Sequence, residues 1–172
     1  MNYAVAFSVN ENRIFNAKVY HHDSNNVSDM DAQKLQKMLL EYFSPNSERP
    51  RLIEASNQLN MVLSVSGSCV FGQYRASGKN KASFAARRAL SHPLLPDMIS
   101  ADHVLLLIKG SEELKTSDFE ALGHVASTLI DNYVRGESNS IIFCGLEFDN
   151  TLNEDVIVYA LATGVVFAAI TE

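Results

Sequence analysis

From residue 50 onward the chain alternates between two hydrophobic periodicities, and this alternation constrains the fold more than any other feature of the sequence. Apolar residues at helical spacing follow Pro50, Ala82 and Phe119, so each of these segments predicts a helix with one buried face. Continuous apolar runs typical of buried strands lie between and after them, at 68–74, 101–108, 141–148 and 156–166, and the last is expected to bend at Gly164 and run on to Ile170. Helices with a single apolar face that alternate with strands predict an α/β (α+β) fold, a two-layer sandwich of a mixed sheet with helices.

The N-terminal segment follows a different pattern. Two short apolar stretches, Tyr3–Val9 and Ile14–Tyr20, flank a polar turn, which predicts a β-hairpin. The polar run His21–Asn26 has the composition of a loop. A helix is then predicted from Ser28 to Phe43, with Asp31 placed to complete a capping box at its start.

The clearest break in the chain is the segment Ser44–Pro50, in which polar residues and two prolines interrupt both periodicities. It predicts two parts, an N-terminal extension of residues 1–48 and a main domain of residues 49–172. Pro50 suits the first turn of a helix, because the N–H that proline lacks is not needed there. Whether the extension continues the sheet or docks separately stays open at this point.

Composition and charge limit the classes of partner. Fourteen Lys and Arg against twenty Asp and Glu give a net charge of -6, which argues against nucleic acid or an anionic membrane as the main partner. No apolar run approaches the roughly 20 residues that span a bilayer. Polar residues at 10–13 interrupt the N-terminal stretch too early for a signal peptide, so we expect a soluble cytoplasmic protein. Cys69 and Cys144 lie inside apolar runs, which favours two reduced core thiols over a disulfide or a metal site.

Several short motifs follow one another between residues 76 and 164. They are Ala76-Ser77-Gly78, the run Ala89–Leu95, the strand Val104–Gly110, Ile141–Gly145 and Val158–Gly164. In this order and at these spacings they resemble the C-terminal half of FtsZ, a member of the tubulin superfamily. The resemblance begins at Arg49, covers about two thirds of the chain, and implies the FtsZ C-terminal fold and an ancestry in polymer assembly. The predicted helix at 28–43 could stand at the place of the long central helix of FtsZ.

The departures from FtsZ concern nucleotide chemistry. FtsZ holds GTP with a glycine-rich loop in a separate domain, whereas none of the eight glycines of this chain precedes Gly67. Such a loop needs glycine so that backbone N–H groups can approach the phosphates. FtsZ presents a pair of acids to the next subunit. Two alignments place the corresponding loop positions on two different sets of three residues in this chain, and neither set contains two acids. The sets are Ile53, Ala55 and Gln58 or, with one gap, Glu54, Ser56 and Leu59. The resemblance therefore argues against GTP binding and hydrolysis, and we expect no cofactor, no bound metal and no catalytic residue.

A group of basic residues is the candidate for a partner-binding surface. Its members are Arg75, Lys79, Lys81, Arg87 and Arg88. A local basic patch on an acidic protein can contact an acidic partner surface. The same residues also fit a solvated helix face, and the sequence leaves both interpretations open.

Two further polar groups are better explained by local structure. The segment His21-His22-Asp23 lacks metal-ligand spacing, which favours a surface loop. An acidic group surrounds the start of the helix near residue 117, where negative charge suits the helix dipole. It consists of Glu112, Glu113, Asp118 and Glu120, and Ser117 with Glu120 predicts a capping box.

Three hypotheses for the function follow. The first is a non-catalytic protein-interaction or assembly module related to the FtsZ C-terminal domain, which binds itself or an FtsZ/tubulin-type protein and is associated with cell division or a tubulin-like polymer. The alternative is a small-molecule-binding protein or enzyme with a ligand cleft at an oligomer interface, because this fold class hosts many such proteins. The third is an excerpt of a longer protein. The Met1 start and the short segment before Arg49 weigh against that third hypothesis.

Overall fold

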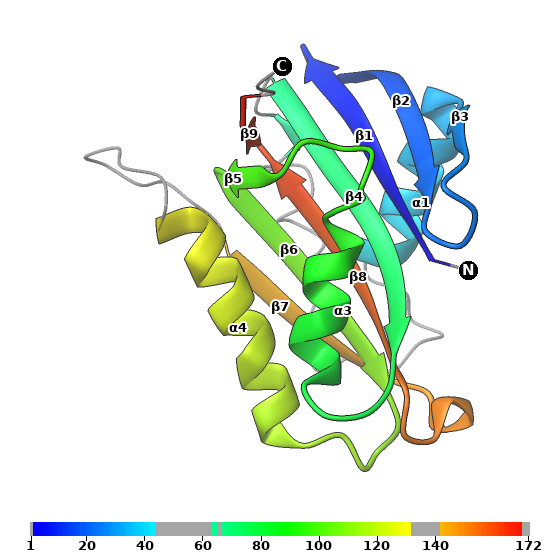
Figure 1. The fold of residues 1–172 in the computed structure, drawn as a ribbon, viewed down its shortest axis with the longest axis vertical. Coiled ribbons are helices and arrows are strands. Elements are labelled where there is room, and N and C mark those ends of the chain that lie inside the picture. Colours follow the sequence, from blue (N-terminus) through cyan, green and yellow to red (C-terminus); the bar gives the residue numbers. More distant parts are fainter. Residues whose placement is uncertain (1, 44–62, 65–66, 132–141, 170–172) are drawn as a thin grey trace.

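The computed structural model describes residues 2–43, 63–64, 67–131 and 142–169. Its main feature is a seven-stranded sheet in the order β3-β2-β1-β4-β8-β6-β7 (Figure 1). The strands are β1 (Tyr3–Asn10), β2 (Arg13–His21), β3 (Val27–Asp29), β4 (Gly67–Ala76), β6 (His103–Gly110), β7 (Ile142–Phe148) and β8 (Val156–Thr163). Neighbouring strands are antiparallel except β6 and β7, which are parallel, so the sheet is mixed.

Helices of the described residues cover both faces of this sheet. The helices α3 (Lys81–Ala89) and α4 (Thr116–Asp131) lie on one face, here called the front face. The helix α1 (Ala32–Phe43) lies on the opposite, back face (Figure 1). Two short strands, β5 (Met98–Ser100) and β9 (Val166–Phe167), pair in a second small sheet. The predicted α/β fold with a mixed sheet is confirmed, and α1 adds a layer behind the sandwich.

The front face is packed by small side chains. The predicted alanine stripe of α3 is buried, with Ala82, Ala85, Ala86 and Ala89 turned towards the sheet. A helix face made of alanine lets the helix backbone approach the strands closely. The approach is closest at Gly72 of β4, where an added Cβ would lie 1.7 Å from the Ala89 carbonyl oxygen. A side chain at this point of β4 would therefore displace the end of α3.

The back face is packed by large aromatic rings. Phe71 of β4 is fully buried, and its ring centroid lies about 6 Å from those of Tyr3, Tyr42 and Phe43 (6.1, 5.9 and 6.1 Å). Tyr42 also stacks on Tyr159 of β8, with the centroids 4.1 Å apart. Tyr3 belongs to β1, and Tyr42 and Phe43 belong to α1, so the N-terminal segment supplies much of this core.

The N-terminal segment continues the sheet rather than docking separately. Strand β1 pairs with β4 along its length, from Tyr3 opposite Gln73 to Val9 opposite Gly67. The turn of the predicted hairpin is present, and Glu11 and Asn12 there have φ of 50° and 62°. The predicted boundary between residues 48 and 49, the helix after Pro50 and the acid-pair positions at 53–59 lie outside the described residues.

Both predicted capping boxes are wrong in detail. Helix α1 begins at Ala32, because Ser28 pairs with Val19 as part of β3. Asp31 caps this helix alone, accepting a hydrogen bond from the Gln33 N–H at 2.7 Å. Helix α4 begins at Thr116, one residue before the predicted start. There the carboxylate of Asp118, rather than that of Glu120, reaches back to accept from the Lys115 N–H at 3.2 Å.

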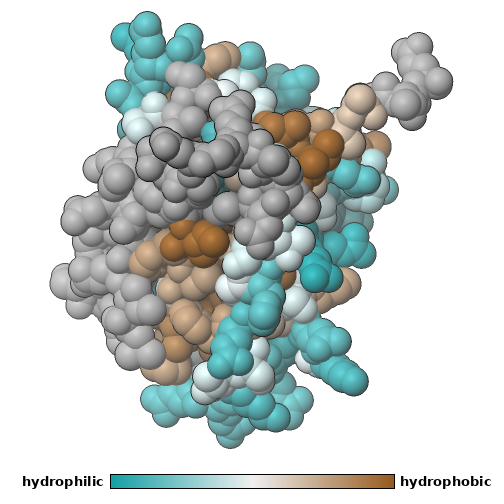
Figure 2. Space-filling model, turned by 90° about the vertical axis from the view of Figure 1, so that its left-hand side faces the viewer, coloured by the Kyte–Doolittle hydropathy of each residue, from teal (hydrophilic) through white to brown (hydrophobic). Residues whose placement is uncertain are grey.

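Two strand predictions also need correction. The segment 142–148 is an edge strand, not a central one, since β7 pairs with β6 alone among the described strands. Figure 2 shows this side of the molecule, with an apolar area beside polar surface, and Ile142 of β7 is 43% exposed. The strand predicted over 156–166 ends at Thr163, because Gly164 turns the chain with φ of 61°. Val166 beyond that bend pairs with Ser100 in the small sheet.

Candidate functional site

The structure divides the five predicted basic residues into two groups, and the first group holds a loop in place. The guanidinium of Arg75, near the end of β4, contacts Asp155 Oδ2 through Nε at 2.9 Å and Nη2 at 2.8 Å. Lys81, at the start of α3, donates from Nζ to the Glu154 carbonyl oxygen at 2.6 Å. Asp155 and Glu154 belong to the loop between the short 3-10 helix η1 (Asn150–Leu152) and β8. We call these contacts the loop clamp. Its two cations, Arg75 and Lys81, hold the loop before β8 against β4 and α3.

Arg88 belongs to the second group and lies on the outer side of α3. Its guanidinium carbon is 5.3 Å from the ring centroid of Phe84 and 6.0 Å from that of Tyr74. Phe84 precedes Arg88 by one helical turn, so the two share a face of α3. The rings of Phe84 and Tyr74 meet edge-on with their centroids 5.7 Å apart, yet Phe84 is 47% exposed. We call Tyr74, Phe84 and Arg88 the aromatic–arginine stack.

Arg87 and Lys79 complete the predicted patch, in different surroundings. Arg87 borders a groove between α3, α4 and β5, whereas Lys79 lies in the loop before α3 beside a polar hollow. Within the described ranges, no carboxylate lies at ion-pair distance from Arg87, Arg88 or Lys79. The positive charge of this second group is therefore exposed and not neutralised by a neighbouring described side chain.

The groove beside Arg87 is apolar inside. It has a volume of about 340 Å³ and is lined by Leu90, Met98, Val125 and Leu129, with Arg87, Ser91, Asp97 and Thr128 as its polar members. Asp97 is exposed and, among the described residues, has no cation at ion-pair distance. An acidic side chain thus lies next to apolar surface on the same side of the molecule as the aromatic–arginine stack.

His22 and His92 meet on the other side of the stack, although they lie far apart in the sequence. Their ring centroids are 5.1 Å apart, and the His22 ring meets Tyr74 edge-on at 5.2 Å. The Leu94 N–H donates to His92 Nδ1 at 3.0 Å, so the His92 proton lies on Nε2 and is donated to the His21 carbonyl oxygen at 3.0 Å. Burial lowers the pKa of His22, and the adjacent His92 lowers it further. This histidine contact joins the turn after β2 to the loop after α3.

The remaining candidates for chemistry are structural. His21 ends β2, whereas a surface loop was predicted over His21-His22-Asp23, and half-buried His22 and exposed Asp23 lie in the turn after it. No group of three His, Cys, Asp or Glu side chains in the described ranges is placed to hold a metal ion. Burial raises the pKa of Cys69 to about 12 and that of Cys144 to about 11, so both thiols are protonated at neutral pH and are poor nucleophiles. Both are free; Cys69 is buried in the back core, and Cys144 packs against the front core.

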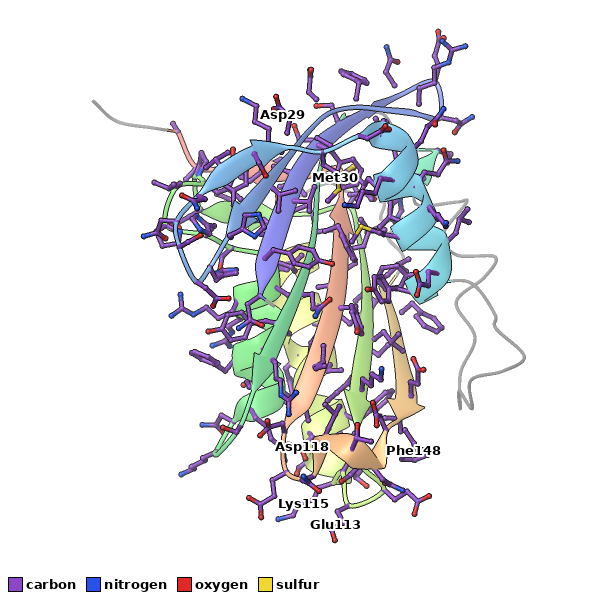
Figure 3. All side chains as sticks on the ribbon, turned by 90° about the vertical axis from the view of Figure 1, so that its right-hand side faces the viewer. Asp29, Met30, Glu113, Lys115, Asp118 and Phe148 are labelled. Atoms are coloured by element: carbon purple, nitrogen blue, oxygen red, sulfur yellow. The ribbon has the colours of Figure 1, made fainter. Side chains whose placement is uncertain are left out.

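The predicted acidic group lies at the end of the molecule where α4 begins (Figure 3). Glu113, Lys115 and Asp118 are together there, and Asp118 is engaged as the N-terminal cap described above. The helix-terminus interpretation therefore suffices for this group. In the parts of the chain that the structure describes, no helix is both long enough and apolar enough to cross a bilayer.

Sequence reasoning missed the aromatic members of this site. The spacing of Phe84 and Arg88 by four residues in a predicted helix was enough to pair them. The approach of Tyr74 and of the two histidines depends on the packing of β4, the turn after β2 and the loop after α3, for which the sequence offers no local pattern.

The profile of the FtsZ family, C-terminal domain, matches residues 67–166, from the start of β4 to the start of β9. This range is more than half of the chain. The chain belongs to the FtsZ family. The strands β1 to β3 and the helix α1 lie outside the matched range, so the FtsZ match covers the front layer and four of the strands of the large sheet.

Individual FtsZ proteins show the same relation. Cell division protein FtsZ of Mycoplasmopsis pulmonis (strain UAB CTIP) is 33% identical over 104 residues, which make up 60% of this chain and 25% of that protein. An empty FtsZ dimer of M. jannaschii is 26% identical with a TM-score of 0.52, over 67% of this chain and 32% of that one. A point mutant of M. jannaschii FtsZ, 22% identical, shows the shared fold with a TM-score of 0.56, over 80% of this chain and 42% of that one. The chain thus spans less than half the length of these relatives, and the resemblance seen in the sequence is confirmed.

Proposed function

We propose that this chain is a non-catalytic interaction module of FtsZ-type assemblies, which binds itself or an FtsZ-type protein and takes part in cell division. The observation that carries the proposal is the match of residues 67–166 to the FtsZ C-terminal domain, on a sheet whose front helices are both in place. The similar proteins are a cell division protein and an FtsZ dimer, which is the context in which this domain occurs elsewhere.

The proposal is non-catalytic for a chemical reason. The C-terminal domain of FtsZ alone is not its GTPase domain, so the match over residues 67–166 gives no support for a GTPase centre. The described side chains around α3 include cations, aromatic rings, two histidines, the exposed carboxylate of Asp97, and the apolar lining of the groove with its hydroxyls. An activated nucleophile needs an adjacent base or a lowered pKa, whereas burial raises the pKa of both thiols.

Pull-down and size-exclusion measurements test this function. The chain is immobilised through an affinity tag and exposed to M. jannaschii FtsZ, with an unrelated acidic protein of similar size as the control. We expect FtsZ to be retained above the control, or the free chain to elute earlier as its concentration rises. A chain that stays monomeric at every concentration and retains no FtsZ would overturn the proposal.

Calorimetry tests the non-catalytic part separately. Titration of GTP with Mg²⁺ into the chain is expected to give only the heat of dilution. Saturable binding of GTP, or phosphate release above the rate in buffer, would contradict this part and leave the interaction function to be judged by the pull-down.

A further inference from the structure

We propose that the aromatic–arginine stack and the apolar groove are the two halves of one self-association contact, in which Phe84 of one copy enters the groove of a second copy. This inference rests on the proposed function, because it names the surface through which the chain binds itself. Both halves flank the same helix, α3, so each copy carries them on one side of the molecule.

The first half of the contact is a projecting aromatic ring. Phe84 is 47% exposed, while the rings and guanidinium around it hold it in place from one side. Exposed aromatic side chains combined with arginine are the composition typical of energetically important interface residues. Burying the free side of the ring in a partner removes apolar surface from water, and the contacts with Tyr74 and Arg88 already restrict the ring on its other side.

The second half is a groove of suitable size and lining. Its volume of about 340 Å³ exceeds the ~150 Å³ of an apolar cavity that holds benzene, so a phenyl ring fits with room for the flanking backbone. Leu90 and Val125 on its walls are almost fully buried, Met98 and Leu129 are partly buried, and the flexible side chain of Met98 can adapt its shape. An aromatic ring is therefore an occupant that the groove can accept.

Charge complementarity points to a second copy as the source of that ring. Arg88 stands beside Phe84, and Asp97 stands beside the groove; among the described residues neither has an ion-pair partner. When Phe84 is seated in the groove of another copy, Arg88 of the first copy can pair with Asp97 of the second. Arginine and carboxylate form strong charge-assisted hydrogen bonds once water is excluded. The pairing also offsets the repulsion between two molecules that each carry a net charge of -6.

Because every copy holds both halves, the contact has two possible closures. It closes as a symmetric dimer if both copies exchange Phe84, and it extends head to tail if each copy gives Phe84 to the next. Both closures require the same residues, so the same variants test them.

Sedimentation equilibrium of the full chain at low salt measures the contact. Phe84→Ala and Arg88→Glu are each expected to weaken self-association about tenfold or more, as for a central interface residue. Asp97→Arg is expected to weaken it similarly. The double variant Arg88→Glu with Asp97→Arg exchanges the two charges and is expected to restore self-association towards that of the unsubstituted chain.

Matched controls separate this contact from general effects of charge and hydrophobicity. Leu40→Ala removes an apolar side chain of similar exposure (46%) on α1, and Arg13→Glu makes the same charge change at an exposed position of β2. Both are expected to associate as the unsubstituted chain does. Phe84, Arg88 and Asp97 are exposed, so circular dichroism is expected to show that all variants remain folded.

The outcomes distinguish this inference from the proposed function. If Phe84→Ala and Arg88→Glu associate like the unsubstituted chain, or if the double variant restores nothing, the α3 contact is wrong. Retention of M. jannaschii FtsZ in the pull-down would in that case leave the proposed function standing. If the chain neither associates at any concentration nor retains FtsZ, both the contact and the function are overturned.

Discussion

The front and back faces of the sheet are packed in two different ways. On the front, an alanine helix approaches β4 so closely that Gly72 touches the end of α3. On the back, Phe71 from the same strand lies among three aromatic rings contributed by β1 and α1. The front layer belongs to the range matched by the FtsZ family, whereas the rings around Phe71 come from outside it. The layer matched by the family is stabilised by the close approach of the α3 backbone to β4. The N-terminal segment is held to the sheet by the packing of its aromatic side chains around Phe71.

The largest effect is expected from removing the centre of the back core. Phe71→Ala would leave a cavity among three rings and lower the free energy of unfolding by about 3–5 kcal/mol. Urea denaturation followed by circular dichroism measures the change. Phe84→Ala removes the same side chain from an exposed position on the front and is expected to cost much less. A loss at Phe71 no larger than at Phe84 would contradict the role assigned to the aromatic core.

The front face is tested by adding an atom rather than removing one. Gly72→Ala places a methyl group against the Ala89 carbonyl, and α3 must move away; overpacking of this kind costs about 1–3 kcal/mol, and contact with backbone places it at the upper end. Gly123→Ala is the matched control, since a Cβ at this position of α4 meets nothing within 4 Å. That change is expected to stabilise the helix by up to about 1 kcal/mol. Equal effects at the two glycines would disprove the close approach.

A smaller effect is expected at the histidine contact where the N-terminal segment meets the front loop. The pKa of His22 is lowered in the folded state from its usual 6.5, so the unfolded chain binds the proton more readily. The stability that this residue contributes is present above pH 6.5 and is lost as the pH falls through the lowered pKa. His22→Phe keeps a ring against Tyr74 but cannot titrate, so its unfolding free energy should fall less between pH 7 and 5.

Measurement at pH 8 serves as the control for His22, because at that pH His22 is neutral in both the folded and the unfolded chain, and the substitution reports lost contacts without proton uptake. Burial also lowers the pKa of His103, so part of the acid sensitivity is expected to remain in the variant. An unchanged pH dependence in His22→Phe would show that the histidine contact does not respond to protonation.

The smallest effect is expected at the loop clamp. Arg75 and Asp155 are about half and one third exposed, so their ion pair is screened by water and contributes about 0.2–1 kcal/mol. A double-mutant cycle with Arg75→Ala and Asp155→Ala measures the coupling, which should shrink further at high salt. A coupling above about 2 kcal/mol would show that the clamp is a main support of the front layer rather than a local restraint.

The sequence predicted the parts of the fold that leave a regular apolar pattern. The alanine stripe of α3 was found because it repeats at the helical period, and β4, β6 and β8 were found because strands packed between two cores are continuous apolar runs. The start of α1 was misplaced, since the local capping pattern at Ser28 competes with a β ladder to β2 that is visible only in three dimensions. The strands β5 and β9 are too short to carry a period.

The sequence predicted which basic residues make up the candidate site, but not how they are arranged in space. The basic residues were found from the sequence, yet their division into clamp and open face depends on Asp155, which lies 80 positions from Arg75. In the same way, His92 reaches the carbonyl of His21, at the end of β2, across 71 positions. Long-range contacts of this kind leave no local pattern in a single sequence.

Co-sedimentation with polymerised FtsZ tests the central claim, that this chain is an interaction module of FtsZ-type assemblies, most directly. Increasing amounts of the chain are mixed with M. jannaschii FtsZ in the presence of GTP, the polymers are pelleted, and the chain in the pellet is quantified. We predict a saturable amount of the chain in the pellet. We predict none when GTP is left out, so that FtsZ stays unpolymerised, and the sample is spun in the same way. A chain that stays in the supernatant at every ratio, and also remains monomeric alone, would contradict the account.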